Sequence, residues 1–90
     1  MDLNITLKRG PEYLHNDVDN EVIMMNMNTG MYVTLNETGR SIWYLLDEPK
    51  TVSQLIAALA VEYSVTPEQC EKDVLPFIEI LTDRKIAVKQ

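Results

Sequence analysis

Few side chains in this sequence are of the kinds that carry out catalysis. The chain has a single histidine, His15, and a single cysteine, Cys70. Neither a zinc site nor a Cys-His nucleophile pair can be built from such a set, because both need more ligands or closer spacing. The carboxylates are scattered, and no glycine-rich phosphate loop occurs. We expect His15 on the surface and Cys70 in the core, with no enzymatic activity, no metal and no cofactor.

Backbone chemistry is the stronger signal, and it lies in residues 31–35. Asn28-Thr29-Gly30 precedes this stretch and is typical of a hairpin turn, because glycine tolerates the positive φ that such a loop needs. The stretch itself is apolar on both faces, without charge, proline or glycine. Edge strands are normally protected by charge, proline or cover, since bare backbone donors and acceptors recruit other chains. An unprotected edge strand is therefore either covered by the fold or used for docking.

Composition limits the classes of protein that remain. The chain has 90 residues, of which 46% are apolar and 24% charged, so we expect one domain over residues 1–90. The longest apolar run, residues 55–61, is too short to cross a bilayer, and the N-terminus has no secretion-signal pattern. One cysteine fits a reducing compartment, so we expect a cytoplasmic protein without a membrane partner. The net charge of −6 argues against nucleic acid as a partner.

The first third of the chain predicts strands. Apolar and polar residues alternate over residues 3–7, which indicates a half-buried strand ended by Gly10-Pro11. A short strand is expected at residues 13–15, a loop at 16–20 and a stronger strand at 21–27. Because neighbouring strands usually pair, residues 31–35 should form the last strand of an antiparallel meander, at its edge.

Helical patterns follow, each with a start signal. Asn36, Thr51 and Thr66 are expected to cap three helices, with Gln54 and Gln69 completing capping boxes for the second and third. The third helix is expected to bend at an internal proline, and residues 86–88 to add a short final strand. Its predicted core stripe consists of Cys70, Val74, Phe77 and Leu81.

The order of these elements predicts a fold class. An N-terminal three-stranded antiparallel sheet followed by three helices is an α+β domain, compatible with a winged helix-turn-helix. Such a fold raises the possibility of DNA binding through the third helix. This helix, however, carries several acids against Lys72 alone, which is the wrong sign for binding phosphates.

An ordered set of residues between 21 and 88 resembles the PqqD-like family. The set comprises Asn28-Thr29-Gly30, Tyr32, Leu35-Asn36, Gly39, Ile42-Trp43, Leu46-Asp47, Thr51-Val52, Leu55, Leu59, Tyr63, Val65, Asp73-Val74, Phe77-Ile78 and Leu81. Residues 1–20 match less well, and Pro76 is not part of the pattern.

The resemblance implies a non-catalytic domain that binds the leader segment of a ribosomally made precursor peptide. In such domains the leader adds a strand to the sheet edge, here residues 31–35, and leans on the third helix, here residues 67–83. The implied partners are the leader and a modifying enzyme, such as the leader peptidase of lasso-peptide pathways. The alternatives are the peptide carrier of pyrroloquinoline quinone synthesis, a winged-helix DNA regulator and a structural subunit.

The expected peptide-binding residues lie on the edge strand and on the third helix. They are Met31, Val33, Thr34, Leu35, Asp73, Pro76, Phe77, Ile80 and Arg84. We expect Met31 and Val33 to line a groove with the helix, and Tyr32, on the opposite face of the strand, to pack inward under the first helix. We expect Asp73 to pair with a basic residue of the leader.

Overall fold

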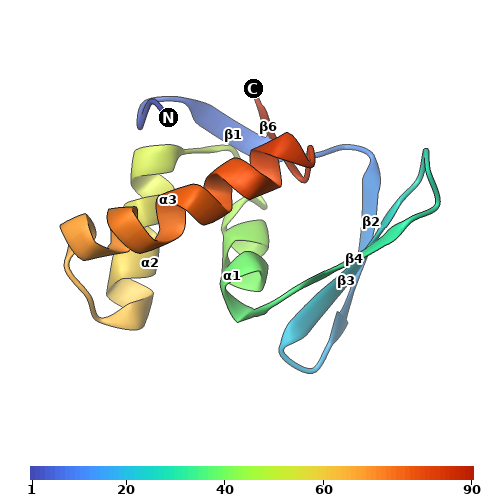
Figure 1. Ribbon diagram of the computed structural model, residues 1–90, viewed down its shortest axis with the longest axis horizontal. Helices are drawn as coiled ribbons and strands as arrows, with labels where there is room; N and C mark the ends of the chain where they lie inside the picture. Colours follow the sequence, from blue (N-terminus) through green and yellow to red (C-terminus); the bar gives the residue numbers. More distant parts are fainter.

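Three helices form the body of the molecule, and a three-stranded sheet projects from it (Figure 1). The computed structural model describes residues 1–90. A second small sheet lies on the body, where the strands nearest the two chain ends pair with each other (Figure 1). The α+β class and the winged helix-turn-helix arrangement are confirmed. No helix has both the length and the apolar character needed to cross a membrane.

The helices begin where their capping residues predict. They are α1 (Glu37–Leu45), α2 (Val52–Tyr63) and α3 (Pro67–Asp83). The side chain of Asn36 accepts a hydrogen bond from the Gly39 amide at 3.1 Å, and Thr51 and Gln54 form the predicted capping box. Thr66 caps α3, but the Gln69 side chain turns away from the cap and donates to Asp73 instead. The capping box predicted for the third helix is therefore only half formed.

The projecting sheet, which we call the wing, contains three antiparallel strands in the order β2-β3-β4. They are β2 (Tyr13–Val18), β3 (Glu21–Asn26) and β4 (Tyr32–Leu35). Gly30 has a φ of 72°, as the predicted hairpin turn requires. The strand β2 is longer than predicted, because residues 16–18 pair fully with β3 and only the tight turn at Asp19 and Asn20 remains as a loop.

The predicted antiparallel meander consists of β2, β3 and β4, whereas the first predicted strand belongs to another sheet. β1 (Thr6–Arg9) lies between β5 (Lys50–Thr51) and β6 (Ala87–Lys89), and residues 3–5 precede it. Gly10 makes the change of sheet possible. Its amide donates to Ile86 at 2.7 Å, and a Cβ on it would lie 1.9 Å from the carbonyl oxygen of Lys85. The predicted final strand is confirmed as β6.

The core lies between the helices and one face of the wing. Its α3 stripe is Cys70, Val74, Ile78 and Leu81. The prediction that Phe77 belongs to this stripe is wrong, because a period of 3.6 residues admits either position and Ile78 takes it with no exposed surface. Phe77 is half-buried beside the core. The helix α3 also continues through Pro76 without interruption.

Candidate functional site

The strand β4 lies at the edge of the wing, as predicted, with one face turned toward the helices. Leu35 is buried and Val33 packs against the core, whereas Tyr32 is 70% exposed on the opposite face. The expectation that Tyr32 packs under the first helix is therefore wrong. Both faces of this strand are apolar. The alternation of its side chains therefore divides them between the two faces, but it does not show which face packs against the helices.

The free backbone groups of this edge belong to Tyr32 and Thr34. The Asn26 amide donates to the Met31 carbonyl at 2.9 Å, and the register continues with Met24 opposite Val33. In an antiparallel ladder, hydrogen-bonded and non-hydrogen-bonded pairs alternate. The amide and carbonyl of Val33 therefore point inward to β3. Those of Tyr32 and Thr34 point outward, away from the sheet.

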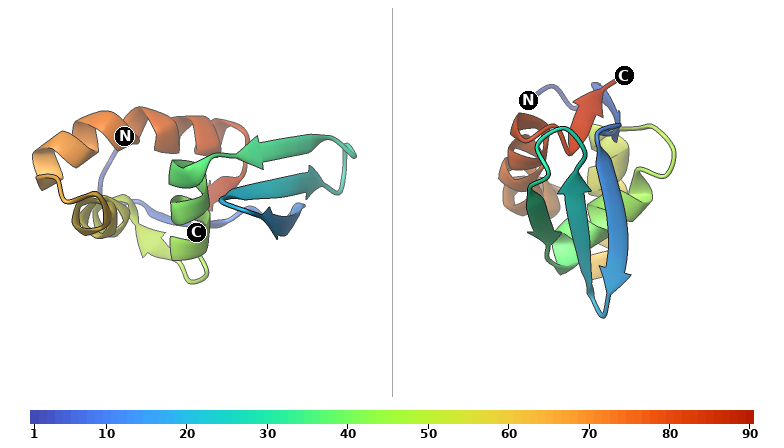
Figure 2. Two further views of the ribbon diagram at one scale, coloured as in Figure 1. Left: turned by 90° about the horizontal axis from the view of Figure 1, so that it is seen from below. Right: turned by 90° about the vertical axis from the view of Figure 1, so that its right-hand side faces the viewer.

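A groove runs between this edge and the C-terminal half of α3. Both views in Figure 2 show β4 on the side of the wing nearest that helix. The groove has a cavity volume of about 200 Å³. Its lining residues are Val33, Thr34, Leu35, Asn36, Phe77, Ile80, Leu81, Arg84 and Ile86. An apolar floor beside a strand with one free edge suits an extended peptide, because backbone groups for pairing and pockets for side chains then lie next to each other.

A second hollow continues the groove toward the N-terminal half of α3. Its cavity volume is about 250 Å³, and it is lined by Asn36, Thr38, Tyr63, Val65, Cys70, Asp73, Val74 and Phe77. Asn36 and Phe77 line both hollows, so the two adjoin at these residues. Gly39 lets α1 approach this point closely, because a Cβ there would already lie 3.4 Å from the Phe77 ring and 3.1 Å from Leu35.

The two ends of this combined groove carry opposite charges. The exposed carboxylate of Asp73 lines the end near the start of α3 and accepts from the Gln69 side chain at 3.0 Å. The exposed Arg84 lines the other end, just beyond the last turn of α3. An extended ligand with a basic and an acidic side chain at matching positions would therefore meet complementary charges.

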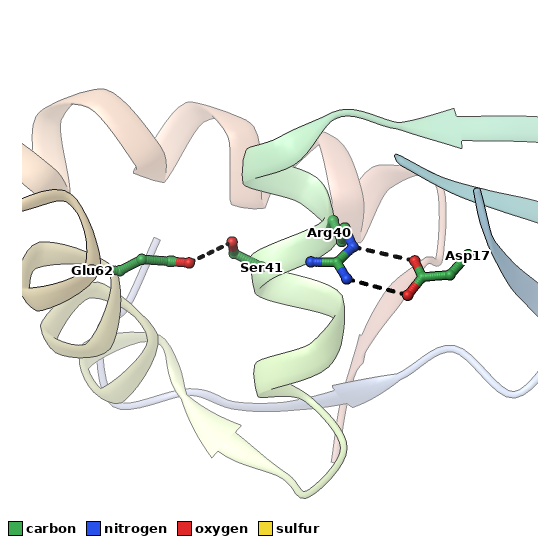
Figure 3. A network of polar contacts seen from close by, with 4 residues as sticks. All are labelled: Asp17, Arg40, Ser41 and Glu62. Carbon is green, nitrogen blue, oxygen red and sulfur yellow. Dashed lines mark hydrogen bonds and ion pairs between the residues drawn. The ribbon is translucent and has the colours of Figure 1, made fainter. Parts of the chain in front are cut away.

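Contacts on the far side of α1 hold the wing in place. The Arg40 guanidinium of α1 makes two hydrogen bonds of 3.2 Å to the Asp17 carboxylate on the wing (Figure 3). The next residue, Ser41, donates to Glu62 at 3.0 Å and so connects α1 to α2. The bonds from Arg40 lower the pKa of Asp17 below its usual value. Both members of the ion pair are partly exposed, so the pair orients the wing more than it stabilises the fold.

Further contacts of the wing with the body come from β2 and the chain just before it. The edge of the His15 ring packs on Trp43, with the ring centroids 5.3 Å apart, and the Arg9 guanidinium lies 4.6 Å from the centre of the same indole ring. The Tyr13 hydroxyl donates to the Arg84 carbonyl at 3.0 Å. The position of β4 relative to α3, and hence the shape of the groove, depends on these contacts.

The structure brings most of the predicted site residues together. Val33, Thr34, Leu35, Phe77, Ile80 and Arg84 share one hollow, and Asp73 shares the adjoining one with Phe77. Met31 is 68% exposed at the hairpin end, and Pro76 is exposed on α3; neither lines the groove. Sequence reasoning missed Asn36, Tyr63 and Val65. Their convergence depends on how α1, α2 and α3 pack, and no local pattern reports it.

The single histidine and the single cysteine lie apart, one on the wing and the other in the core. His15 is exposed on β2, as predicted, and packs on the side of α1 described above. Cys70 is buried, and its thiol donates to the Ile56 carbonyl at 3.4 Å. Burial raises the pKa of this thiol, which keeps it protonated and unreactive at neutral pH. No cluster of three or more His, Cys, Asp or Glu side chains has the geometry to hold a metal ion.

Fold and groove together define a winged helix-turn-helix domain with an open strand edge beside its third helix. The sequence model of the family described as "Coenzyme PQQ synthesis protein D (PqqD)" matches residues 21–87. The chain belongs to this family. It is also similar to a solved structure described as "TbiB1 in Complex with the TbiA(beta) Leader Peptide", with 30% identity and a TM-score of 0.77 over 89% of this chain and 93% of that one. No curated protein sequence gives a significant match.

Proposed function

We propose that this chain binds the leader segment of a ribosomally made precursor peptide and delivers the peptide to a modifying enzyme, without catalysing a reaction itself. The observation that carries the proposal is β4, a strand with no protecting charge or proline that lies directly beside the groove on α3. Membership of the PqqD family supports this function. So does the similarity to a protein solved with a leader peptide.

In the proposed complex the leader becomes the fourth strand of the wing. Its backbone pairs with the outward amides and carbonyls of Tyr32 and Thr34. Its side chains then alternate between the two faces of the sheet. Those opposite Val33 and its neighbours of the same parity point into the groove, against Phe77 and Ile80. General affinity comes from the backbone, and selection of the leader comes from these apolar contacts.

The charges at the ends of the groove add selectivity. We assign Asp73 to a basic leader residue and Arg84 to an acidic one, because each is exposed where it lines the groove. Exposed pairs of this kind contribute about 0.2–1 kcal/mol each, so they tune binding rather than drive it. Leu35 is buried under the groove and supports its floor. Met31 and Pro76 lie outside the groove, and the proposal gives them no contact with the leader.

The enzyme served by the domain is proposed to be a leader peptidase of the lasso-peptide type. The similarity to TbiB1 favours this assignment, since that match covers nearly the whole of both chains. The alternative is peptide delivery in the synthesis of pyrroloquinoline quinone, which the description of the family favours. Because the precursor is made on ribosomes, the proposal places the protein in the cytoplasm.

A titration tests the proposed function. A candidate leader peptide is labelled with a fluorophore, and its anisotropy is followed as the domain is added. We expect saturable binding, and no binding of a peptide with the same composition in shuffled order. Equal affinity for both peptides would overturn the proposal, because a specific leader site must distinguish their sequences.

A further inference from the structure

The face of the wing that points away from the helices is apolar and uncovered. Figure 2 shows this sheet in front of the helices in its right-hand view. The strand register places Leu14 beside Met25 and Met25 beside Tyr32, and it places Asn16, Ile23 and Thr34 in the next row. Leu14 is 54% exposed and Ile23 36%. We call these six residues the outer face. All of them except Thr34 line a shallow hollow of about 270 Å³, together with His15.

Nothing in the folding of this chain explains the outer face. A half-buried strand normally alternates between an apolar inner side and a polar outer side. The inner side of the wing already buries Val22, Met24 and Leu35 against the helices. Apolar side chains on the other side contribute no comparable burial, and exposed apolar patches of this kind on soluble domains often mark interaction sites.

We propose that the outer face is the docking surface of the enzyme that processes the leader-bound precursor peptide. The proposal rests on the proposed function and extends it to the second partner. A leader strand on β4 continues the sheet, so its side chains opposite Tyr32 and Thr34 extend the two rows of the outer face. An enzyme docked there touches the domain and the leader at once. It therefore binds the loaded domain more tightly than the empty one.

Charge favours such an enzyme over a second copy of this chain. None of the six residues of the outer face is charged, and Glu21 is the only charged side chain on the same side of the sheet. The whole chain carries a net charge of −6, so two copies stacked through this face would repel each other. A neutral or basic apolar surface on the enzyme meets no such repulsion.

The test uses Leu14→Asp with Val61→Asp as its matched control. Leu14 lies on β2, two strands away from the leader edge. Val61 is 80% exposed on α2, outside the wing, and receives the same charge. For each variant, leader affinity is measured by anisotropy. The kcat/KM for processing of the precursor is measured with the purified processing enzyme.

We expect both variants to bind the leader as the wild type does. Leu14→Asp should lower kcat/KM at least about tenfold, as loss of an interface anchor does, while Val61→Asp leaves it unchanged. Equal rates for the two variants overturn the docking proposal, whereas failure of the wild type to bind leader overturns the proposed function instead. Leu14→Thr, which suits a strand and adds no charge, replaces the aspartate variant if that variant loses its circular dichroism signal. A wild-type dimer that the Leu14 variant dissociates would also overturn the proposal.

Discussion

Thr34→Pro tests whether the outward backbone of β4 binds the leader. The Thr34 amide points away from β3, so proline there removes no hydrogen bond of the wing itself. Proline is tolerated in edge strands at positions whose amide faces solvent. The preceding residue, Val33, is already extended, which is the conformation that a following proline favours. The variant should therefore fold while losing a donor that the leader needs.

The expected size of the effect follows from one lost intermolecular bond. A typical hydrogen bond contributes about 0.5–1.5 kcal/mol net, and an acceptor left without a partner costs about 1–3 kcal/mol. A loss of about 1–3 kcal/mol raises Kd by about 5- to 140-fold. Thr34→Val is the control, because it keeps the amide and the β-branched shape and should bind within about twofold of the wild type.

Val33→Pro provides the opposite comparison. The Val33 amide points to Met24 within the sheet, so proline there breaks a bond of the wing and should lower its thermal stability. Leader affinity is measured by anisotropy and folding by circular dichroism, for all three variants. Folded Thr34→Pro protein that binds leader as Thr34→Val does would refute the reasoning about this edge.

Five further substitutions test the groove and the fold. Asp73→Asn should weaken leader binding by about 0.2–1 kcal/mol and flatten its dependence on salt, whereas an unchanged salt slope in the titration would exclude the charge pair. Phe77→Ala should reduce the free energy of leader binding, measured by anisotropy, more than the free energy of unfolding, measured by urea denaturation. Ile78→Ala should lower the free energy of unfolding by about 2–5 kcal/mol, checked by the same two measurements. Gly10→Ala should cost about 1–3 kcal/mol of stability, since its Cβ would meet a backbone carbonyl; a wild-type melting temperature would contradict this. The pKa of Asp17 is lowered in the folded state, so its ionised side chain stabilises the fold at neutral pH, and this contribution is lost as the pH falls below about 3.8. The free energy of unfolding of Asp17→Asn, measured by denaturation between pH 7 and 3, should not show this loss.

Local signals in the sequence predict the parts of the site that depend on neighbouring residues. The turn at Gly30, the strand after it and the cap at Asn36 follow one another within a few residues, and each has a strong sequence preference. The capping box of α2 is equally local. The edge position of β4 is also predictable, because sequential strands pair in order.

Long-range packing decides what the sequence cannot predict. Tyr32 and Val33 are both suited to a core, and only the position of α3 determines that Val33 faces it. Phe77 and Ile78 both fit the core stripe, and the packing of α3 on the body selects Ile78. The two-residue strand β5 exists only through pairing with β1, so it has no sequence pattern of its own.

Amide hydrogen exchange at β4 reports directly on whether the leader pairs with this strand. The amides of Tyr32 and Thr34 have no partner in the wing, whereas the Val33 amide is already paired with β3. Exchange rates are measured by NMR for the domain alone and with saturating leader peptide. We expect the amides of Tyr32 and Thr34 to become strongly protected on leader binding, while protection of Val33 changes little. Leader binding that leaves Tyr32 and Thr34 exchanging as fast as in the free domain would contradict this expectation.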